Sequence, residues 1–434
     1  MSQKLRDSVW DRHGVVERML RDVVLPKMAA VRQTLDQEVV ESIPDAVKGE
    51  MSRAEIGRTI RSGASIAITV GSRGIANIGP ITREIVRSVR SLGGEPFVIP
   101  AMGSHGGGTA EGQRELLASL GVTEETVGAP VRSSMEVVQV GVLEDGRPVF
   151  IDKLASESDG IIVVGRVKPH TAYRGRYESG LFKMLAIGLG KHQGAEACHD
   201  QGFSRMVENV PLFAKAILAN APILFGIAII ENAHDETCRI VALEKDRIEE
   251  EEPVLLEEAR ARMAQIYIRD IDVLIVDEIG KNHSGDGMDP NVTGSFSTPY
   301  ASGGPNVQHY VVLDVSEQSH GNVVGLGRAD YTTKRVFDKA DFDVTYPNAL
   351  TAKVALVAKT PMVLSSDRLA IQAAIKTCEG IGSEGPRVVR IRNSAHVDEI
   401  LVSENLIPGV EAHPKMSLLA APLALEFDAT GNLF

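Results

Sequence analysis

The sequence is poor in cysteine. Only three of its 434 residues are cysteines, Cys198, Cys238 and Cys378, and they lie far apart in the chain. An odd number of widely spaced cysteines argues against both a disulfide framework and a zinc knuckle. Such usage is typical of a reducing compartment, so we expect a cytoplasmic protein.

The chain also lacks long apolar stretches, an excess of basic residues and many aromatic side chains. No stretch approaches the roughly 18 apolar residues that a membrane span needs, and residues 1–20 lack the apolar core of a signal peptide. The 58 acidic and 46 basic residues give a net charge of −12, which repels a phosphate backbone. Aromatic residues make up only 4% of the chain, so base-stacking platforms are few. We expect neither a membrane nor a nucleic acid as partner.

The chain is long enough for two domains, because single cores stop growing at roughly 250 to 300 residues. The first 60 residues, most clearly 15–40, have helical periodicity and form an N-terminal helical extension, in which Pro26 is expected to divide the run into two helices. A charged helix at 247–265, whose acidic run we interpret as a solvated face, precedes the apolar strand at 271–280. We therefore predict an N-terminal α/β domain at 1–270, which includes the extension, and a C-terminal α/β domain at 271–434.

Short β-branched runs, each followed by a glycine-rich turn and a helix, fill the first domain. The clearest examples are SIAITVGSRG, EPFVIPAMGSHGGG and DGIIVVGRVKPH. Strand, turn and helix in repeated order predict mainly parallel sheets covered by helices. The predicted fold is therefore α/β, with two such domains and a cofactor or active-site crevice between them.

Three loops follow these strands, at 71–77, 103–109 and 166–177. Ligands of open parallel sheets bind beyond the carboxyl ends of the strands, which is where these loops lie. The loops carry Arg73, His105 and His170, and glycines beside His105 would let backbone N–H groups approach an anion. Taken singly, each of these residues could equally serve as a turn or capping element.

The segment from His170 to His199 holds the most concentrated chemistry. Lys183 is flanked by the apolar residues LF and ML, and burial would make its amine more nucleophilic, although a lysine can also extend along an apolar face to water. His199 is a candidate ligand for a soft metal. His192 lies seven positions earlier, two helical turns away, too far to share an ion with His199, and we interpret it as a surface residue.

This segment resembles the signature of the lactate racemase family, PH…GG.K…PG…H. The interval of sixteen positions from Lys183 to His199 equals that between the family's cofactor-bearing lysine and its nickel-binding histidine. AMGSHGGGTAEG and GSRG resemble two further blocks of the family, in the same order. The resemblance covers about residues 65–300.

The resemblance implies a nickel-pincer nucleotide, pyridinium-3,5-bisthiocarboxylic acid mononucleotide, attached covalently to Lys183 with its nickel bound by His199. It implies that Ser72, Arg73 and Gly106 contact this cofactor. Histidines 105 and 170 would act as the acid/base pair of a 2-hydroxy acid racemase or epimerase. The cofactor can be absent from protein made in a host that does not synthesise it.

Several departures from the family concern the substrate. Gly71 stands where the family usually has an aspartate, Ile187 replaces a proline, and the glutamine and lysine that position lactate have no clear counterpart. The segment YRGRYESG adds Arg174, Arg176 and Tyr177, which we expect to bind a sugar acid or dicarboxylic hydroxy acid together with Arg73.

The second domain is expected to close over the substrate with a glycine-rich loop. This loop carries Lys281, which we expect to contact the substrate, and also His283, Asp286 and Asp289. Acidic residues in such loops equally often cap turns. The expected partners are a small hydroxy acid and the enzymes of cofactor synthesis, and a homo-oligomer is compatible with the sequence.

Two alternatives stay open from the sequence alone. One is a zinc- or manganese-dependent hydrolase or lyase that uses His105, His170 and His199 as ligands, although no close-set ligand pair such as H-x-x-x-H is present. The other is a non-catalytic binder of hydroxy acids that keeps the fold without the chemistry.

Overall fold

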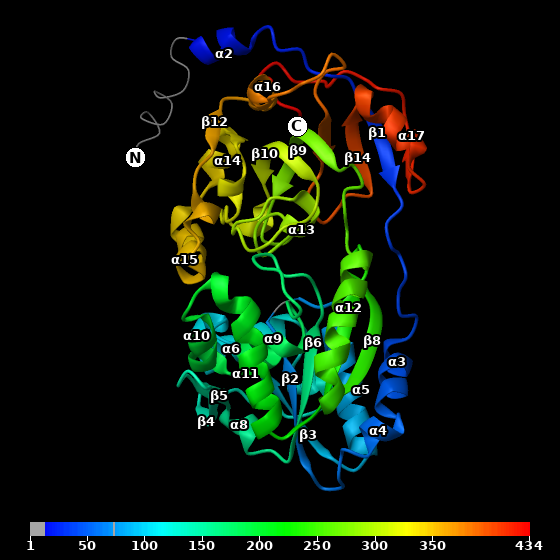
Figure 1. Ribbon diagram of the computed structural model, residues 1–434, viewed down its shortest axis with the longest axis vertical. Helices are drawn as coiled ribbons and strands as arrows, with labels where there is room; N and C mark the ends of the chain where they lie inside the picture. The colour runs from blue at the N-terminus through cyan, green and yellow to red at the C-terminus, as the bar shows by residue number, and fades with distance from the viewer. Residues whose placement is uncertain (1–13, 73) are drawn as a thin grey trace. The chain divides into compact units, whose positions relative to one another are not determined.

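The computed structural model describes residues 14–72 and 74–434, and these divide into two compact units (Figure 1). One unit comprises Asp36–Met263, and the other comprises Ala264–Phe434 together with the described residues up to Leu35. The chain is an α/β protein with mainly parallel sheets, as predicted. The expected division at 270 differs from the observed one chiefly at the N-terminus, where residues before Asp36 join the unit of the C-terminal sheet.

The unit of Asp36–Met263 is built on a five-stranded sheet of order β3-β2-β6-β7-β8. The first four strands are parallel, and β8 is antiparallel to β7. A separate hairpin of β4 and β5 accompanies the sheet. The strands are β2 Ser65–Val70, β3 Glu95–Pro100, β4 Val137–Val142, β5 Pro148–Asp152, β6 Gly160–Arg166, β7 Ile223–Glu231 and β8 Thr237–Glu244.

Helices cover both faces of this sheet, which is why its strands read as unbroken β-branched runs. Alternate residues such as Ile66 and Ala67 enter two different cores. One core includes residues of α3, α5 and α7, and the other includes residues of α9, α11 and α12. The helices are α3 Ile43–Met51, α4 Ala54–Gly57, α5 Ile78–Ser91, α6 Ala110–Ser119, α7 Glu124–Val127, α8 Lys153–Ser156, α9 Leu181–Lys183, α10 Lys191–His199, α11 Met206–Asn220 and α12 Ile248–Arg262.

The other unit is built on an eight-stranded sheet of order β12-β11-β10-β9-β13-β14-β1-β15. The first five strands of this order, β12, β11, β10, β9 and β13, are parallel to their neighbours. The pairs β13–β14, β14–β1 and β1–β15 are antiparallel. The strands are β1 Met28–Gln33, β9 Asp270–Ile279, β10 Asn306–Val315, β11 Tyr331–Thr333, β12 Met362–Leu364, β13 Val388–Ile391, β14 Glu399–Ser403 and β15 Met416–Leu418. The helices are α2 Val15–Leu20, α13 Pro290–Thr293, α14 Lys334–Lys339, α15 Phe342–Ala352, α16 Asp367–Thr377 and α17 Ile407–Ala412.

Strand β1 corrects the prediction of a second helix after Pro26. Residues Met28–Gln33 form a strand that pairs with β14 on one side and β15 on the other. The segment after Pro26 has a mixed pattern in which a helix and a strand are both plausible, and the two partner strands decide in favour of the strand. Within the described part of the first 60 residues, α2 lies before Pro26, and α3 and α4 follow β1.

Candidate functional site

Three loops meet at the carboxyl edge of the five-stranded sheet. Ser72 follows β2, His105 follows β3 and His170 follows β6, and these strands are neighbours in the order β3-β2-β6. The edge therefore gathers the loops that the sequence singled out. Arg73, expected to hold the cofactor and the substrate, lies outside the described residues.

The loop after β3 directs His105 toward the loop after β2. The Nδ1 atom of the exposed His105 ring is in hydrogen-bond contact with the hydroxyl of Ser72. Gly106 adopts φ +65°, and a Cβ there would lie 2.7 Å from the backbone nitrogen of Gln113 in α6. Gly106, which is predicted to contact the cofactor, thus also lets the loop approach the first turn of α6.

His170 contacts Lys183. The backbone N–H of Ala172 donates to His170 Nδ1 at 3.0 Å, and His170 Nε2 lies 2.6 Å from Lys183 Nζ. The Lys183 amine therefore lies within hydrogen-bond distance of the His170 imidazole. A lysine is nucleophilic in its neutral form, and a neighbouring imidazole can exchange a proton with it.

A buried carboxylate that the sequence analysis missed anchors the His170 loop. Glu178 accepts the backbone N–H of His170 at 2.7 Å and that of Gly175 at 3.2 Å. Arg174 and Arg260 form ion pairs with the same carboxylate at 3.3 and 3.2 Å. Because its side chain is fully buried, Glu178 holds the loop at a point that solvent does not reach.

A second buried carboxylate, Glu252 of α12, supports the short helix α9 that ends at Lys183. Its carboxylate accepts the backbone N–H of Phe182 at 2.9 Å. A Cβ on Gly180 would lie 2.5 Å from Glu252 Oε1, so this close approach requires a glycine. Burial raises the pKa of Glu252 to about 8, although the backbone N–H groups of Phe182 and Leu181 oppose the shift.

The burial of Glu252 corrects the interpretation of the acidic run as a wholly solvated face. Glu250 is exposed, whereas Glu252 points into the core with Leu255, Leu256 and Ala259. These four positions follow helical spacing, so a carboxylate within an apolar stripe was the signal that could have identified Glu252.

His199 is the last residue of α10, and its ring and that of His170 both neighbour the ring of Phe203. The ring of Phe203 has its centroid 6.4 Å from that of His199 and 6.2 Å from that of His170. His199 Nδ1 is 2.7 Å from the carbonyl oxygen of Ala195, so it donates, and Nε2 carries the lone pair that a metal would use. His192 lies in the first turn of the same helix and is exposed.

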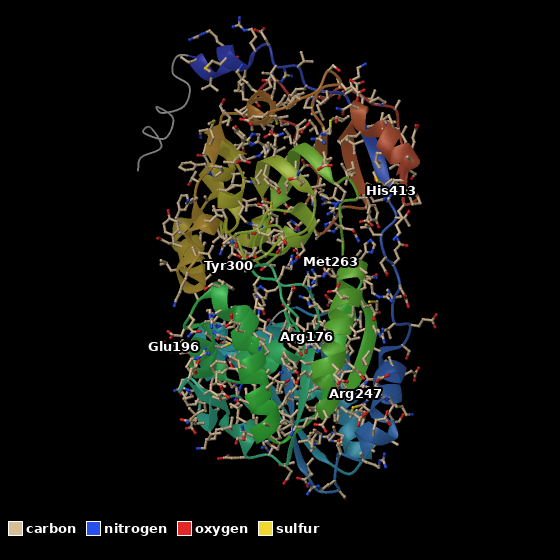
Figure 2. The ribbon with its side chains drawn as sticks, in the orientation of Figure 1. Arg176, Glu196, Arg247, Met263, Tyr300 and His413 are labelled. Atoms are coloured by element: carbon tan, nitrogen blue, oxygen red, sulfur yellow. The ribbon has the colours of Figure 1, made fainter. Side chains whose placement is uncertain are left out.

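The three residues expected to bind the substrate are engaged with the protein itself. Arg174 donates to the carbonyl oxygen of His170 at 2.5 Å as well as pairing with Glu178. Arg176 lies beside α12 (Figure 2), where its guanidinium contacts the Glu249 carbonyl at 3.4 Å. Tyr177 is buried, and its hydroxyl donates to the same carbonyl at 2.8 Å.

The predicted lid residues lie in the other unit, in the loop after β9. Lys281 Nζ donates to the carbonyl of Gly285 at 2.8 Å and to Asn348 Oδ1 at 2.7 Å. His283 Nε2 lies 2.8 Å from Glu278 Oε1. The side chain of Asp289 accepts the backbone N–H of Asn291 at 2.9 Å and caps α13. Asp286 accepts a hydrogen bond from Arg328 through its backbone carbonyl.

An ion pair that the sequence analysis missed holds the loop after β2. Glu231 Oε1, at the end of β7, accepts the backbone N–H of Ala76 at 2.7 Å. Arg166, at the end of β6, pairs with the other oxygen of the Glu231 carboxylate. The pair thereby ties the 71–77 loop to two neighbouring strands.

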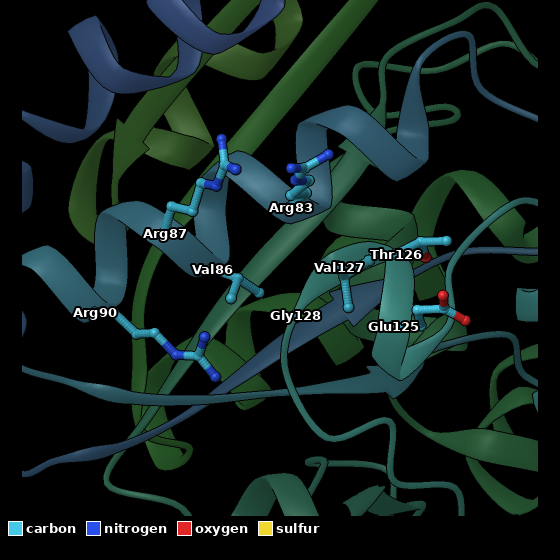
Figure 3. A pocket seen from close by; sticks show the side chains of 8 residues that line it. All are labelled: Arg83, Val86, Arg87, Arg90, Glu125, Thr126, Val127 and Gly128. Atoms are coloured by element: carbon cyan, nitrogen blue, oxygen red, sulfur yellow. The ribbon is translucent and has the colours of Figure 1, made fainter.

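Within residues 14–72 and 74–434, no group of three or more histidine, cysteine or acidic side chains is arranged to hold a metal ion. The three-histidine site of the hydrolase alternative is therefore not assembled there. A pocket beside α5 and α7 lies apart from the predicted site residues (Figure 3). It is lined by Arg83, Val86, Arg87, Arg90, Glu125, Thr126, Val127 and Gly128.

The sequence of residues 15–208 matches the family model of the lactate racemase N-terminal domain. This match supports the lactate racemase family for residues 15–208. The matched part includes all of the candidate residues from Ser72 to His199. No curated protein sequence matches the chain.

Among solved structures, this chain is similar to the lactate racemase apoprotein from Thermoanaerobacterium thermosaccharolyticum. The TM-score is 0.51 at 16% identity, over 84% of this chain and 94% of the other. A Thermotoga maritima protein of known structure gives a TM-score of 0.48 at 12% identity, over 75% and 84% of the two chains. The first likeness shows a shared fold. In the part of this chain that the structure describes, no helix is both long enough and apolar enough to cross a membrane.

Proposed function

We propose that this protein is a racemase or epimerase of a 2-hydroxy acid that works with a nickel-pincer nucleotide held by Lys183 and His199. The observation that carries the proposal is the contact of 2.6 Å between Lys183 Nζ and His170 Nε2. It joins a nucleophilic lysine to a histidine at the edge of the sheet where ligands bind. The match to the family model of the lactate racemase N-terminal domain supports the same chemistry.

The residues present fit the proposed cofactor. Lys183 is half-buried on α9, and its amine lies 2.6 Å from His170 Nε2. Covalent attachment would use this amine in its neutral form. His199 carries a lone pair on Nε2, which suits a single imidazole ligand to nickel. When bound, the cofactor would supply a hydride acceptor for the hydrogen on the reacting carbon.

Two histidines would move the proton of the substrate hydroxyl. One histidine would take the proton from the substrate hydroxyl, and the other would give a proton back to the substrate oxygen when the opposite stereoisomer forms. The bound cofactor would supply the acceptor and donor for the hydride, so no external oxidant would be consumed. His105 is placed by Ser72, and His170 is placed by Glu178, so each has its own support. An ordinary imidazole suits both acid and base roles near neutral pH.

We further propose that the preferred substrate is a sugar acid or dicarboxylic hydroxy acid rather than lactate. Support comes from the absence of clear counterparts for the residues that position lactate in the family. The guanidinium groups of Arg174 and Arg176 contact Glu178 and the Glu249 carbonyl, so binding through either arginine would require a rearrangement. A panel of hydroxy acids tests this choice, and lactate as the best substrate would contradict it.

The decisive experiment measures intact mass after co-expression with the cofactor-synthesis enzymes. The wild type should carry an added mass and contain nickel. Lys183→Arg keeps a long basic side chain but lacks the primary amine, so it should lose the added mass. Lys215→Arg, at an exposed lysine paired with Glu249, is the matched control and should keep the added mass. An adduct that persists in Lys183→Arg would place the attachment elsewhere.

The metal ligand is tested by a pair of histidines on one helix. His199→Ala should lose nickel and racemisation, because the imidazole that binds the metal is gone. His192→Ala should retain both, since His192 is exposed in the first turn of α10. Elemental analysis measures the nickel content of both variants. Loss of nickel in His192→Ala alone would mean that His192, and not His199, is the metal ligand.

A further inference from the structure

A charged and fully buried network lies beneath the loop that carries His105. The side chains of Lys191, Asp152 and Gln113 are inaccessible to solvent. Lys191 Nζ forms an ion pair with Asp152 at 2.9 Å and donates to Gln113 Oε1 at 3.2 Å and to the Pro100 carbonyl. Burial lowers the pKa of Lys191, and the charge of Asp152 opposes the shift. Buried ion pairs are costly to form, and they often specify geometry rather than add stability.

Gln113 connects this lysine to the loop. Its Nε2 group donates to the carbonyl of Gly103 at 2.9 Å and to that of His105 at 3.2 Å. The amide can make both bonds only while its nitrogen faces the loop. Lys191 fixes this orientation because it donates to the oxygen at the other end of the amide. Without Lys191, a rotated amide would set its oxygen against two carbonyl oxygens.

The backbone conformation of Lys191 indicates that the contacts of its side chain hold the residue in place. Its φ is +52°, in the left-handed region, where any residue other than glycine costs roughly 1 to 2 kcal/mol. The residue begins α10, the helix that ends at His199. The three partners of Lys191 come from β3, β5 and α6, so they bring separate elements together at one ammonium group.

We propose that Lys191 is a positioning residue for His105, acting through the amide of Gln113. Lys191 orients the amide, the amide holds the two loop carbonyls, and the loop places the His105 ring beside Ser72. This inference rests on the proposed function, in which His105 moves the substrate proton. Lys191 itself is shielded from substrate by its burial.

The test separates the positioning role from the racemase activity. In Gln113→Met the clamp on the loop is lost, while Lys191 keeps Asp152 and the Pro100 carbonyl. Lys191→Met combined with Asp152→Asn removes the buried charge pair and leaves the cap of α8, which Asp152 Oδ1 provides. Gln139→Met, on the exposed face of β4, is the matched control. Imidazole ¹⁵N spectra of the apoprotein report on His105, whose signals are assigned from the spectrum of His105→Ala.

Both test variants should shift the His105 Nδ1 signal because the contact with Ser72 changes, while the His170 signals stay in place. In the loaded enzyme, kcat should fall about 10- to 100-fold, the range expected when a catalytic group is displaced by about 1 Å. KM should change by less than about threefold, since neither residue touches the substrate, and the control should match wild type. If the double variant does not fold, Gln113→Met decides alone, because it keeps the charge pair.

Unchanged His105 signals in folded Gln113→Met would overturn the positioning role, whatever the activity. A wild type that loads cofactor but racemises no hydroxy acid would overturn the proposed function, and the ¹⁵N signals would still test the positioning. A shift of His170 as large as that of His105 would show general loosening of the site and would also count against the proposal.

Discussion

Replacing Glu178 by glutamine should loosen the His170 loop without unfolding the protein. The carboxylate holds two backbone N–H groups, of His170 and Gly175, and two guanidinium groups, of Arg174 and Arg260. Glutamine has nearly the same shape but only one acceptor oxygen and no charge. It can keep one of the N–H bonds and loses the two ion pairs.

The size of the effect follows from these contacts. Removing one partner of a buried pair costs about 3 to 5 kcal/mol when the remaining charge stays buried. Here the arginine side chains are 20% and 36% exposed, so water compensates part of the loss. Hydrogen bonds to a charged group contribute about 1.5 to 3 kcal/mol. We expect local opening to become easier by about 2 kcal/mol, which is roughly a 30-fold larger open population.

Hydrogen exchange followed by mass spectrometry measures this opening directly. Peptides spanning residues 168–183 should exchange about 30-fold faster in Glu178→Gln when exchange is limited by the opening equilibrium. Glu208→Gln removes an exposed ion pair with Arg205 and should leave exchange within about twofold of wild type. Exchange in residues 168–183 that is unchanged in Glu178→Gln would refute the claim that this carboxylate anchors the loop.

Two further predictions concern buried groups near the site. The pKa of Glu252 is raised to about 8 by burial, so between about pH 4.5 and 8 the folded state binds a proton that the unfolded state has released. The free energy of unfolding should therefore fall as pH rises through this window, by up to about 1.4 kcal/mol per pH unit. Glu252→Gln should flatten this dependence in urea titrations at several pH values, and an equally steep dependence in the variant would contradict the assignment. Tyr177→Phe should lower stability by about 1 kcal/mol because the bond to the Glu249 carbonyl is lost. Its KM for the hydroxy acid should match that of wild type, and a tenfold higher KM would restore Tyr177 as a substrate ligand.

The sequence predicted those strands whose pattern is set locally. The segments SIAITVGSRG, EPFVIPAMGSHGGG and DGIIVVGRVKPH contain β2, β3 and β6. Both faces of these strands are buried, so they read as unbroken β-branched segments bounded by glycine or polar turns. The loops after them follow from the same pattern, which is why His105 and His170 could be placed at one edge of the sheet.

Structure that depends on distant partners could not be predicted in this way. β1 is a strand because β14 and β15 flank it, and neither is near it in the chain. Glu178 and Lys191 resemble ordinary charged residues until the fold supplies their partners. Their roles depend on which backbone N–H or carbonyl groups the chain brings to them, and sequence spacing carries no such information.

The pairing of β1 also sets an order for folding during synthesis. About 370 residues separate the end of β1 at Gln33 from the start of β14 at Glu399. At about 5 to 20 residues per second, a ribosome needs roughly 20 to 75 s to deliver that partner strand. All residues of the five-stranded sheet are made within this interval, so its unit can be complete while β1 still has an unpaired edge. An edge exposed for so long is a template for unwanted strand pairing, and the newly made chain has to keep it shielded until about the last tenth of the protein emerges.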